Sequence, residues 1–281
     1  MEVITAKTAG FCFGVERAVK TVYEELDKGK KVYTFGPIVH NQNVIDDLSA
    51  RGVSVIDADT FAKAIDETIV IRAHGVSEKI VQSLENKGLN IVDATCPFVK
   101  RIHKLAREAS EEGRTLVVIG DPDHPEVKGI LGWAGDDAKV VKNIEDVHGL
   151  GLKFDTKLTV VSQTTFNAGK FKEIIAQITK LYYDVTWFNT VCNATKERQE
   201  EAMKIASVVD VMIVIGDEVS SNTRKLVEIC NERCNRTIFI RTVKDLERHN
   251  LHGAQIVGIT AGASTPNYII EEVQNHVRTE F

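Results

Sequence analysis

The stretch DATCPFVKR, residues 93–101, ends a predicted strand on a cysteine and starts a helix directly after it. Pro97 supports this interpretation, because proline suits the first turn of a helix, where its missing N–H would have no partner anyway. Cys12 and Cys192 each stand at the same kind of junction, after a strand-like run and before a helical one. The three junctions indicate that the chain repeats one structural pattern.

The spacing of glycines supports a threefold repeat. A glycine that ends an apolar run follows each cysteine after 24 residues: Cys12 and Gly36, Cys96 and Gly120, Cys192 and Gly216. Polar residues follow these glycines at matching distances, namely His40, His124 and Ser220 after four residues, and Gln42, Glu126 and Asn222 after six. A repeated period of this kind is typical of a fold built from similar units. We therefore predict α/β units at residues 14–96, 97–192 and 193–281, with residues 1–13 completing the third.

Apolar runs of strand length recur along the whole chain. They lie at residues 31–35, 69–71, 116–119, 158–161, 211–215 and 256–259. Continuous runs, as opposed to alternating ones, are typical of parallel strands that are covered on both faces. We predict an α/β fold in which three units form a trefoil about a pseudo-threefold axis. The polar loops at the carboxyl ends of the strands would then face one central cavity, because parallel sheets bind ligands at those ends.

Composition excludes several functional classes. The 281 residues carry a net charge of −5 without a polybasic block, which argues against nucleic acid as a partner. The chain contains no apolar run of membrane length and no export signal, so a cytoplasmic protein without a membrane partner is expected. In that compartment the five cysteines stay reduced, and any that cluster point to a metal or to catalysis.

The three junction cysteines, Cys12, Cys96 and Cys192, are the candidate metal ligands. Each is predicted at a helix N-terminus, where free N–H groups and the helix dipole favour a thiolate. Three thiolates suit either a zinc ion or a [4Fe-4S] cluster with one open iron site. Cys230 and Cys234 have no counterpart in the other repeats, and we expect them to be structural.

The middle repeat carries the candidate acid. Glu126 is the one carboxylate among the three positions six residues after the glycines, so we predict that it donates protons. His124 beside it could orient it. Thr164, which we interpret as the counterpart of His74, could hydrogen-bond a substrate hydroxyl. The alternatives are a solvated loop carboxylate for Glu126 and a helix cap for Thr164.

A further set of histidine, hydroxyl and amide side chains follows the predicted strands. This anion set consists of His40, His74, Ser220, Ser221, Asn222 and Ser264. Such donors, helped by helix N-termini, can bind a phosphate or a diphosphate, although the three residues at 220–222 could also simply cap a helix. The other histidines lack repeat counterparts and are expected on the surface: His103, His148, His249, His252 and His276.

Taken together, these motifs resemble the 4-hydroxy-3-methylbut-2-enyl diphosphate (HMBPP) reductase family, also known as IspH or LytB. The matching motifs run from one end of the chain to the other. They are AGFCFGV at 9–15, GPIVHN at 36–41, RAHG at 72–75, DATCP at 93–97, HPE at 124–126, SQTT at 162–165, NTVC at 189–192, SSN at 220–222 and AGAS at 261–264.

The resemblance implies a trefoil around a [4Fe-4S] cluster held by Cys12, Cys96 and Cys192. It implies a two-electron reduction that removes the HMBPP hydroxyl as water and gives isopentenyl and dimethylallyl diphosphates. The hydroxyl would bind the open iron, Glu126 would supply protons, and His124 and Thr164 would contact Glu126 or the hydroxyl end. The anion set would hold the diphosphate, and ferredoxin or flavodoxin would bring electrons. Because the sequence ends at residue 281, no RNA-binding extension is expected.

Two other functional classes remain open. A quinolinate-synthase-like dehydratase resembles this pattern in having one cluster cysteine in each of three units, but it needs no external reductant. A non-enzymatic iron-sulfur or zinc sensor could use the same three thiolates. A sensor would have no use for Glu126 or for the anion set.

Overall fold

The computed structural model describes residues 1–61, 67–249 and 251–280, so that Phe281, the last residue of the sequence, lies outside the described part. Its contacts divide the chain into two compact units. One, here the terminal unit, contains Met1–Glu16, His40–Asp47 and Asn193–Phe281. The other, here the central unit, contains Arg17–Val39 and Leu48–Cys192.

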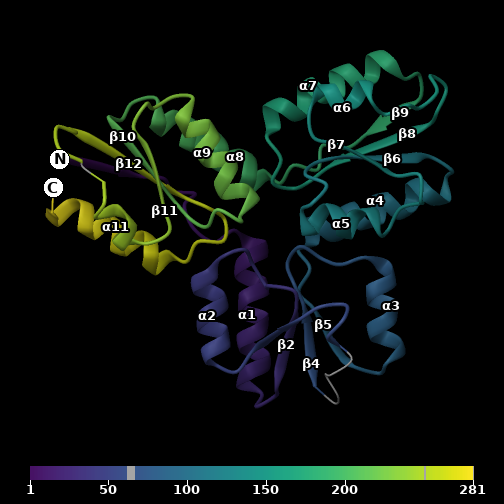
Figure 1. Ribbon diagram of the computed structural model, residues 1–281, viewed down its shortest axis with the longest axis horizontal. Helices are drawn as coiled ribbons and strands as arrows, with labels where there is room; N and C mark the ends of the chain where they lie inside the picture. Colours follow the sequence, from purple (N-terminus) through teal and green to yellow (C-terminus); the bar gives the residue numbers. More distant parts are fainter. Residues whose placement is uncertain (62–66, 250, 281) are drawn as a thin grey trace. The chain divides into compact units, whose positions relative to one another are not determined.

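Three parallel four-stranded sheets make up the strand framework (Figure 1). Their orders are β3-β2-β4-β5, β7-β6-β8-β9 and β11-β10-β12-β1. Within each repeat the second strand therefore lies at one edge, followed by the first, third and fourth strands. The α/β fold with three repeated sheets is confirmed, and so is the prediction that the first strand of the chain completes the third sheet. The boundaries between the three predicted units, which we placed at the cysteines, remain a prediction.

The first repeat builds one sheet of the central unit. Its elements are α1 (Phe13–Asp27), β2 (Val32–Phe35), α2 (Gln42–Ala50), β3 (Ser54–Ile56), β4 (Thr68–Ile71), α3 (Glu78–Asn86) and β5 (Asn90–Asp93). Leu84 of α3 packs on Phe35, Ile69 and Ile71 of the sheet, and all four side chains are buried.

The second repeat has a core layer on each face of its sheet. Its elements are α4 (Pro97–Glu111), β6 (Thr115–Ile119), α5 (Pro125–Leu131), β7 (Lys139–Val141), α6 (Ile144–His148), β8 (Leu158–Ser162), α7 (Ala168–Leu181) and β9 (Val185–Trp187). Val117 packs with Ile174 of α7, and the next residue, Val118, packs with Ile102 of α4. Successive side chains of a strand point to opposite faces, which explains the continuous apolar run. Figure 1 shows α6 and α7 on one face and α4 and α5 on the other.

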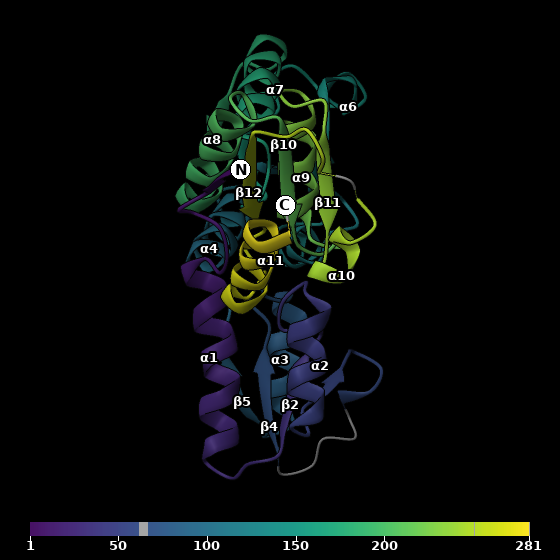
Figure 2. The same cartoon turned by 90° about the vertical axis from the view of Figure 1, so that its left-hand side faces the viewer.

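The third repeat lies in the terminal unit. Its elements are α8 (Asn193–Ala206), β10 (Val211–Ile215), α9 (Ser221–Asn231), β11 (Thr237–Ile240), α10 (Val243–Leu246), β12 (Ile256–Ala261) and α11 (Asn267–Glu280), together with β1 (Glu2–Thr5). Figure 2 shows β12, β10 and β11 side by side. Ile213 packs with Val273 of α11, whereas Met212 packs with Ala202 of α8 on the opposite face.

The register between the first and third strands aligns the three repeats residue by residue. The paired residues at the strand ends are Phe35 and Ile71, Ile119 and Ser162, and Ile215 and Ala261. Counting three residues onward places Thr165 at the position of His74 and Ser264. The predicted equivalence of Thr164 with His74 is therefore wrong by one residue, because motif spacing alone does not reveal where a strand ends.

The neighbouring first and third strands also mark the place where the connections diverge, which in such sheets is where ligands bind. The loops that leave these two strands carry the candidate acid and the anion set. None of the described helices combines the length and hydropathy needed to span a membrane.

Candidate active site

The three junction cysteines occupy the same backbone position in their repeats. The N–H of Cys12 donates to the carbonyl of Ala263 over 3.2 Å, that of Cys96 to Ala73 over 3.0 Å, and that of Cys192 to Thr164 over 3.0 Å. In each repeat the acceptor lies two residues after the end of the third strand. Each cysteine also immediately precedes a helix, α1, α4 or α8, as predicted. Each bond lies within one compact unit.

Accessibility separates these cysteines from the remaining two. Cys12, Cys96 and Cys192 are partly exposed thiols outside any disulfide, whereas Cys230 and Cys234 are buried in the core of the third repeat. Burial, together with the neighbouring Cys234, raises the pKa of Cys230 to about 12. Accessible thiols at helix N-termini suit metal coordination, and buried thiols with a raised pKa do not. The chemistry of the donor set therefore fits a cluster bound by thiolates.

Glu126 is placed by the start of α5 in the central unit. His124 caps this helix, and its Nδ1 accepts the N–H of Glu126 over 3.1 Å. The Glu126 side chain is only 2% exposed. Thr164 donates its N–H to Oε1 over 2.6 Å and its hydroxyl to Oε2 over 2.7 Å. The solvated-loop alternative for Glu126 is excluded by this burial, and Thr164 contacts the carboxylate directly.

Burial raises the pKa of Glu126 to about 7, and the two hydrogen bonds from Thr164 oppose that rise. Desolvation disfavours the charged carboxylate, while donors that point at it favour the charged form. A group whose pKa lies near neutral pH can both hold and release a proton under working conditions. Glu126 is therefore equipped to act as a general acid.

His124, the cap of α5, packs against a second histidine, His74. The rings of His74 and His124 meet edge to face, with centroids 5.4 Å apart and planes at 78°. Because Nδ1 of His124 accepts a backbone N–H, a neutral ring must carry its proton on Nε2. His124 therefore has an Nε2–H that can donate to a ligand. The structure brings His74, His124, Glu126 and Thr164 together within the central unit.

The rest of the anion set lies in the terminal unit. Ser220 is the N-cap of α9 and accepts the N–H of Thr223 over 3.4 Å, as the capping alternative predicts. The Ser264 hydroxyl donates to the carbonyl of His40 over 2.9 Å. Asn222 is 3% exposed, and neither its side-chain nitrogen nor its oxygen has a hydrogen-bond partner among the described residues. A buried amide left without partners is costly, so Asn222 points to a ligand as well as to a helix.

Comparisons with known proteins show the family of this chain. The sequence profile of the family described as LytB protein matches residues 3–278. The chain belongs to the LytB family. Two relatives are named 4-hydroxy-3-methylbut-2-enyl diphosphate reductase: that of Caldanaerobacter subterraneus subsp. tengcongensis is 43% identical, with 99% of this chain and 97% of the relative covered, and that of Aquifex aeolicus is 41% identical, with 99% and 96% covered.

Solved structures of LytB-family relatives extend the similarity to the fold. A structure titled as (E)-4-hydroxy-3-methyl-but-2-enyl diphosphate reductase, the terminal enzyme of the non-mevalonate pathway, matches with a TM-score of 0.72 and 40% identity, covering 99% of both chains. The E-1-hydroxy-2-methyl-but-2-enyl-4-diphosphate reductase of Plasmodium falciparum matches with a TM-score of 0.90 and 30% identity, covering 99% of this chain and 87% of that one.

Sequence reasoning missed Asp217 in this LytB-family chain. Its carboxylate is 7% exposed and accepts the N–H groups of Gln42 and Val219, each over 3.2 Å. A signal was available, because Asp217 follows Gly216 as Asp121 follows Gly120. The contact with Gln42, however, joins residues 175 positions apart and leaves no trace in local spacing.

Arg72 was also missed as a charged neighbour of the anion set. Its Nε donates to the carbonyl of Gly75 over 3.5 Å, and its guanidinium packs over Gly36. Burial lowers the pKa of Arg72, and no ion pair to it is present among residues 1–61, 67–249 and 251–280. A positive charge therefore lies two residues before His74.

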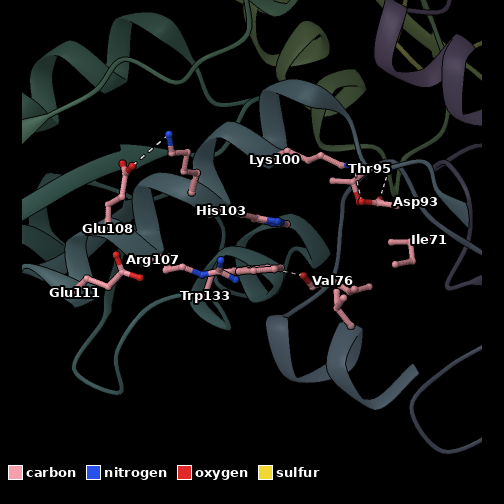
Figure 3. A pocket seen from close by; sticks show the side chains of 12 residues that line it. Ile71, Val76, Asp93, Thr95, Lys100, His103, Arg107, Glu108, Glu111 and Trp133 are labelled. Atoms are coloured by element: carbon pink, nitrogen blue, oxygen red, sulfur yellow. Dashed lines mark hydrogen bonds and ion pairs between the residues drawn. The ribbon is translucent and has the colours of Figure 1, made fainter. Parts of the chain in front are cut away.

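The prediction that His103 lies on the surface is wrong. His103 is 6% exposed, because it shares the buried face of α4 with Val99 and Ala106 at helical spacing. Its ring stacks on Trp133, with centroids 5.1 Å apart, and burial lowers its pKa to about 4. Both rings line a cavity of about 400 Å³ in the central unit (Figure 3).

The outcome differs among the other histidines that lack repeat counterparts. His148, His249 and His252 are exposed, as predicted, whereas His276 is partly buried. The spacing of His103 from Val99 and Ala106 could have identified it as a buried residue of α4.

Proposed function

We propose that this chain is an HMBPP reductase of the non-mevalonate isoprenoid pathway. It would convert HMBPP, two electrons and two protons into isopentenyl or dimethylallyl diphosphate and water. The observation that carries the proposal is the buried Glu126 carboxyl, with a pKa of about 7, held by both donors of Thr164. Full-length similarity to reductases of that name supports the choice of substrate.

The chemistry explains why such an acid is needed. The C–O bond of an allylic alcohol breaks slowly when hydroxide must leave, and a proton delivered to the oxygen lets it leave as water. Glu126 supplies this proton. The second proton is added to a carbon atom of the product, which has lost the hydroxyl group. Thr164 holds the Glu126 carboxyl in place, and the Nε2–H of His124 can donate to the hydroxyl end of the substrate.

Cys12, Cys96 and Cys192 would hold a [4Fe-4S] cluster. When bound, this group would supply electrons and Lewis acidity at its open iron. The partial exposure of the three thiols and their equivalent positions in the repeats support this assignment. Ferredoxin or flavodoxin would deliver the electrons, in the cytoplasm.

The anion set would bind the diphosphate group of HMBPP. Asn222 offers a buried NH₂ group that has no hydrogen-bond partner among the described residues, and an anion requires such a donor. His40, His74, Ser221 and Ser264 would add further donors. The Arg72 guanidinium, which has no described ion pair, raises the local positive potential near His74.

The decisive experiment is anaerobic purification, followed by iron analysis and turnover of HMBPP with a reduced dye. We expect about four irons per chain and product formation that requires the reductant. Stoichiometric zinc without iron would favour a zinc site, and iron without HMBPP turnover would favour a sensor. Iron together with reductant-independent dehydratase activity would favour the quinolinate-synthase-like alternative.

A further inference from the structure

A buried carboxylate stands among the residues of the terminal unit that are proposed to bind an anion. Asp217 lies three residues before Ser220, in the loop between β10 and α9, the helix that begins with Ser221 and Asn222. Its negative charge would repel a diphosphate, so its presence requires another reason. The reason lies in its contacts, because one carboxylate oxygen accepts the N–H of Gln42, the first residue of α2.

The second repeat provides an internal comparison. Asp121 accepts the N–H of Asp123 over 3.2 Å, just as Asp217 accepts the N–H of Val219 over 3.2 Å. This part of the arrangement is a common local turn. The other oxygen differs, because that of Asp121 pairs with exposed Lys142, whereas that of Asp217 bonds to Gln42, two residues after His40. Asp217 therefore bonds to the segment that follows His40, whereas Asp121 pairs with a lysine of its own repeat.

We propose that Asp217 is a positioning residue that holds His40 in place for diphosphate binding. The inference rests on the proposed function. A carboxylate at the N-terminus of α2 satisfies a free N–H and interacts favourably with the helix dipole. It thereby ties the segment that begins at His40 to the loop that leads into α9, the helix that carries Asn222.

A second bond to the same segment explains why this tie is needed. The Ser264 hydroxyl has one proton and donates it to the carbonyl of His40. When Ser264 donates to a diphosphate, that bond to His40 is broken. The bond between Gln42 and Asp217 uses no group that binds the anion, so it remains in place and keeps His40 fixed.

The test is the affinity of the cluster-loaded protein for inorganic pyrophosphate, measured by calorimetry with Asp217→Ala and with Asp121→Ala as the matched control. Loss of a hydrogen bond to a charged group should weaken pyrophosphate binding about tenfold in Asp217→Ala and leave it unchanged in the control. Removal of a repelling charge alone would instead strengthen binding. The sign of the change in affinity therefore distinguishes the two effects. Unchanged or tighter pyrophosphate binding overturns the proposal.

Two further variants keep the test independent of folding defects in Asp217→Ala. Gln42→Pro removes the donated N–H, at a helix position that proline tolerates, and should cause a similar loss. It also removes the exposed bond from the Gln42 side chain to Asp46, so Gln42→Ala, which keeps the N–H, is its control and should bind pyrophosphate normally. In a His40→Ala background, Asp217→Ala should have no further effect, and an undiminished effect would refute a role through His40. If wild-type protein turns over HMBPP while Asp217→Ala binds pyrophosphate normally, only the present inference fails. Absence of both activities in wild type would remove the proposed function itself.

Discussion

Thr164 donates both its N–H and its hydroxyl to the carboxylate of Glu126, over 2.6 and 2.7 Å. Its carbonyl accepts the N–H of Cys192 over 3.0 Å. One residue therefore connects the proposed proton donor with a proposed cluster ligand inside the central unit. Its two donors favour the charged carboxylate and burial favours the neutral one, and the balance leaves the pKa of Glu126 at about 7.

Glu126→Gln should abolish most turnover and leave the cluster intact. Glutamine keeps the size and most of the hydrogen bonding of the side chain but cannot release a proton at neutral pH. General acid catalysis contributes about 10² to 10⁴ in rate, so kcat should fall at least about 100-fold. Iron content and HMBPP turnover with a reduced dye should be measured on the same preparation. Turnover within a few-fold of wild type would exclude Glu126 as the proton donor.

Thr164→Val should shift the pH profile of the reaction to higher pH. The hydroxyl of Thr164 lowers the pKa of Glu126, so its removal raises that pKa further above 7. The reaction needs protonated Glu126, and kcat/KM should fall above the pKa. The pH at which kcat/KM begins to fall should therefore be higher in Thr164→Val than in wild type. It should be unchanged in Thr164→Ser, which keeps the hydroxyl. The pH dependence of pyrophosphate binding controls for ionisation of the substrate.

The raised pKa of Glu126 also predicts a pH dependence of folding stability. The folded state keeps the proton up to about pH 7, whereas the unfolded chain loses it near the ordinary value of 4.5. The free energy of unfolding should therefore be highest below pH 4.5 and fall as the pH rises to 7, by about 3 kcal/mol from this group. Urea denaturation of wild type and Glu126→Gln at pH 5 and pH 8 measures how much the free energy of unfolding of each protein changes with pH. Equal pH slopes for the two proteins would contradict the raised pKa.

The cysteine assignment predicts which thiols hold iron. Serine in place of Cys12, Cys96 or Cys192 should lower the iron content of anaerobic protein, because a hydroxyl is a poor ligand for a cluster that thiolates bind. Cys230→Ala is the matched control, since that thiol is buried among apolar side chains. It should keep its iron and lose some stability. Iron loss in Cys230→Ala alone would overturn the assignment.

Much of this arrangement could be predicted from the sequence, because the repeats carry the same chemistry at the same spacing. The position of Cys96 directly before a helix was predicted in this way, and so was the place of the first strand in the third sheet. The predicted equivalence of Thr164 with His74 was wrong by one residue, because the end of a strand depends on its pairing with a neighbouring strand. Asp217 was missed because its partner lies far away in the chain, a relationship that only the folded structure reveals.

Gly75→Ala tests whether the buried His103 supports the loop that carries His74. Gly75 has φ +72°, and a Cβ atom there would lie 2.6 Å from Cε1 of His103. Gly113 has φ +65° with nothing within 4 Å of a Cβ, so Gly113→Ala measures the backbone cost alone, about 1 to 2 kcal/mol. Gly75→Ala should cost a further 1 to 3 kcal/mol, roughly the usual penalty for overpacking.

Urea denaturation of the two alanine variants measures this difference, and the KM for HMBPP measures its effect on the site. KM should rise in Gly75→Ala, because the displaced backbone adjoins His74, and stay unchanged in Gly113→Ala. Trp133 stacks on His103 and donates its Nε1–H to the carbonyl of Val76 over 2.8 Å, so an imidazole that moved away from Gly75 would give up this stacking. Equal losses in the two variants would mean that His103 moves aside freely and does not support the loop.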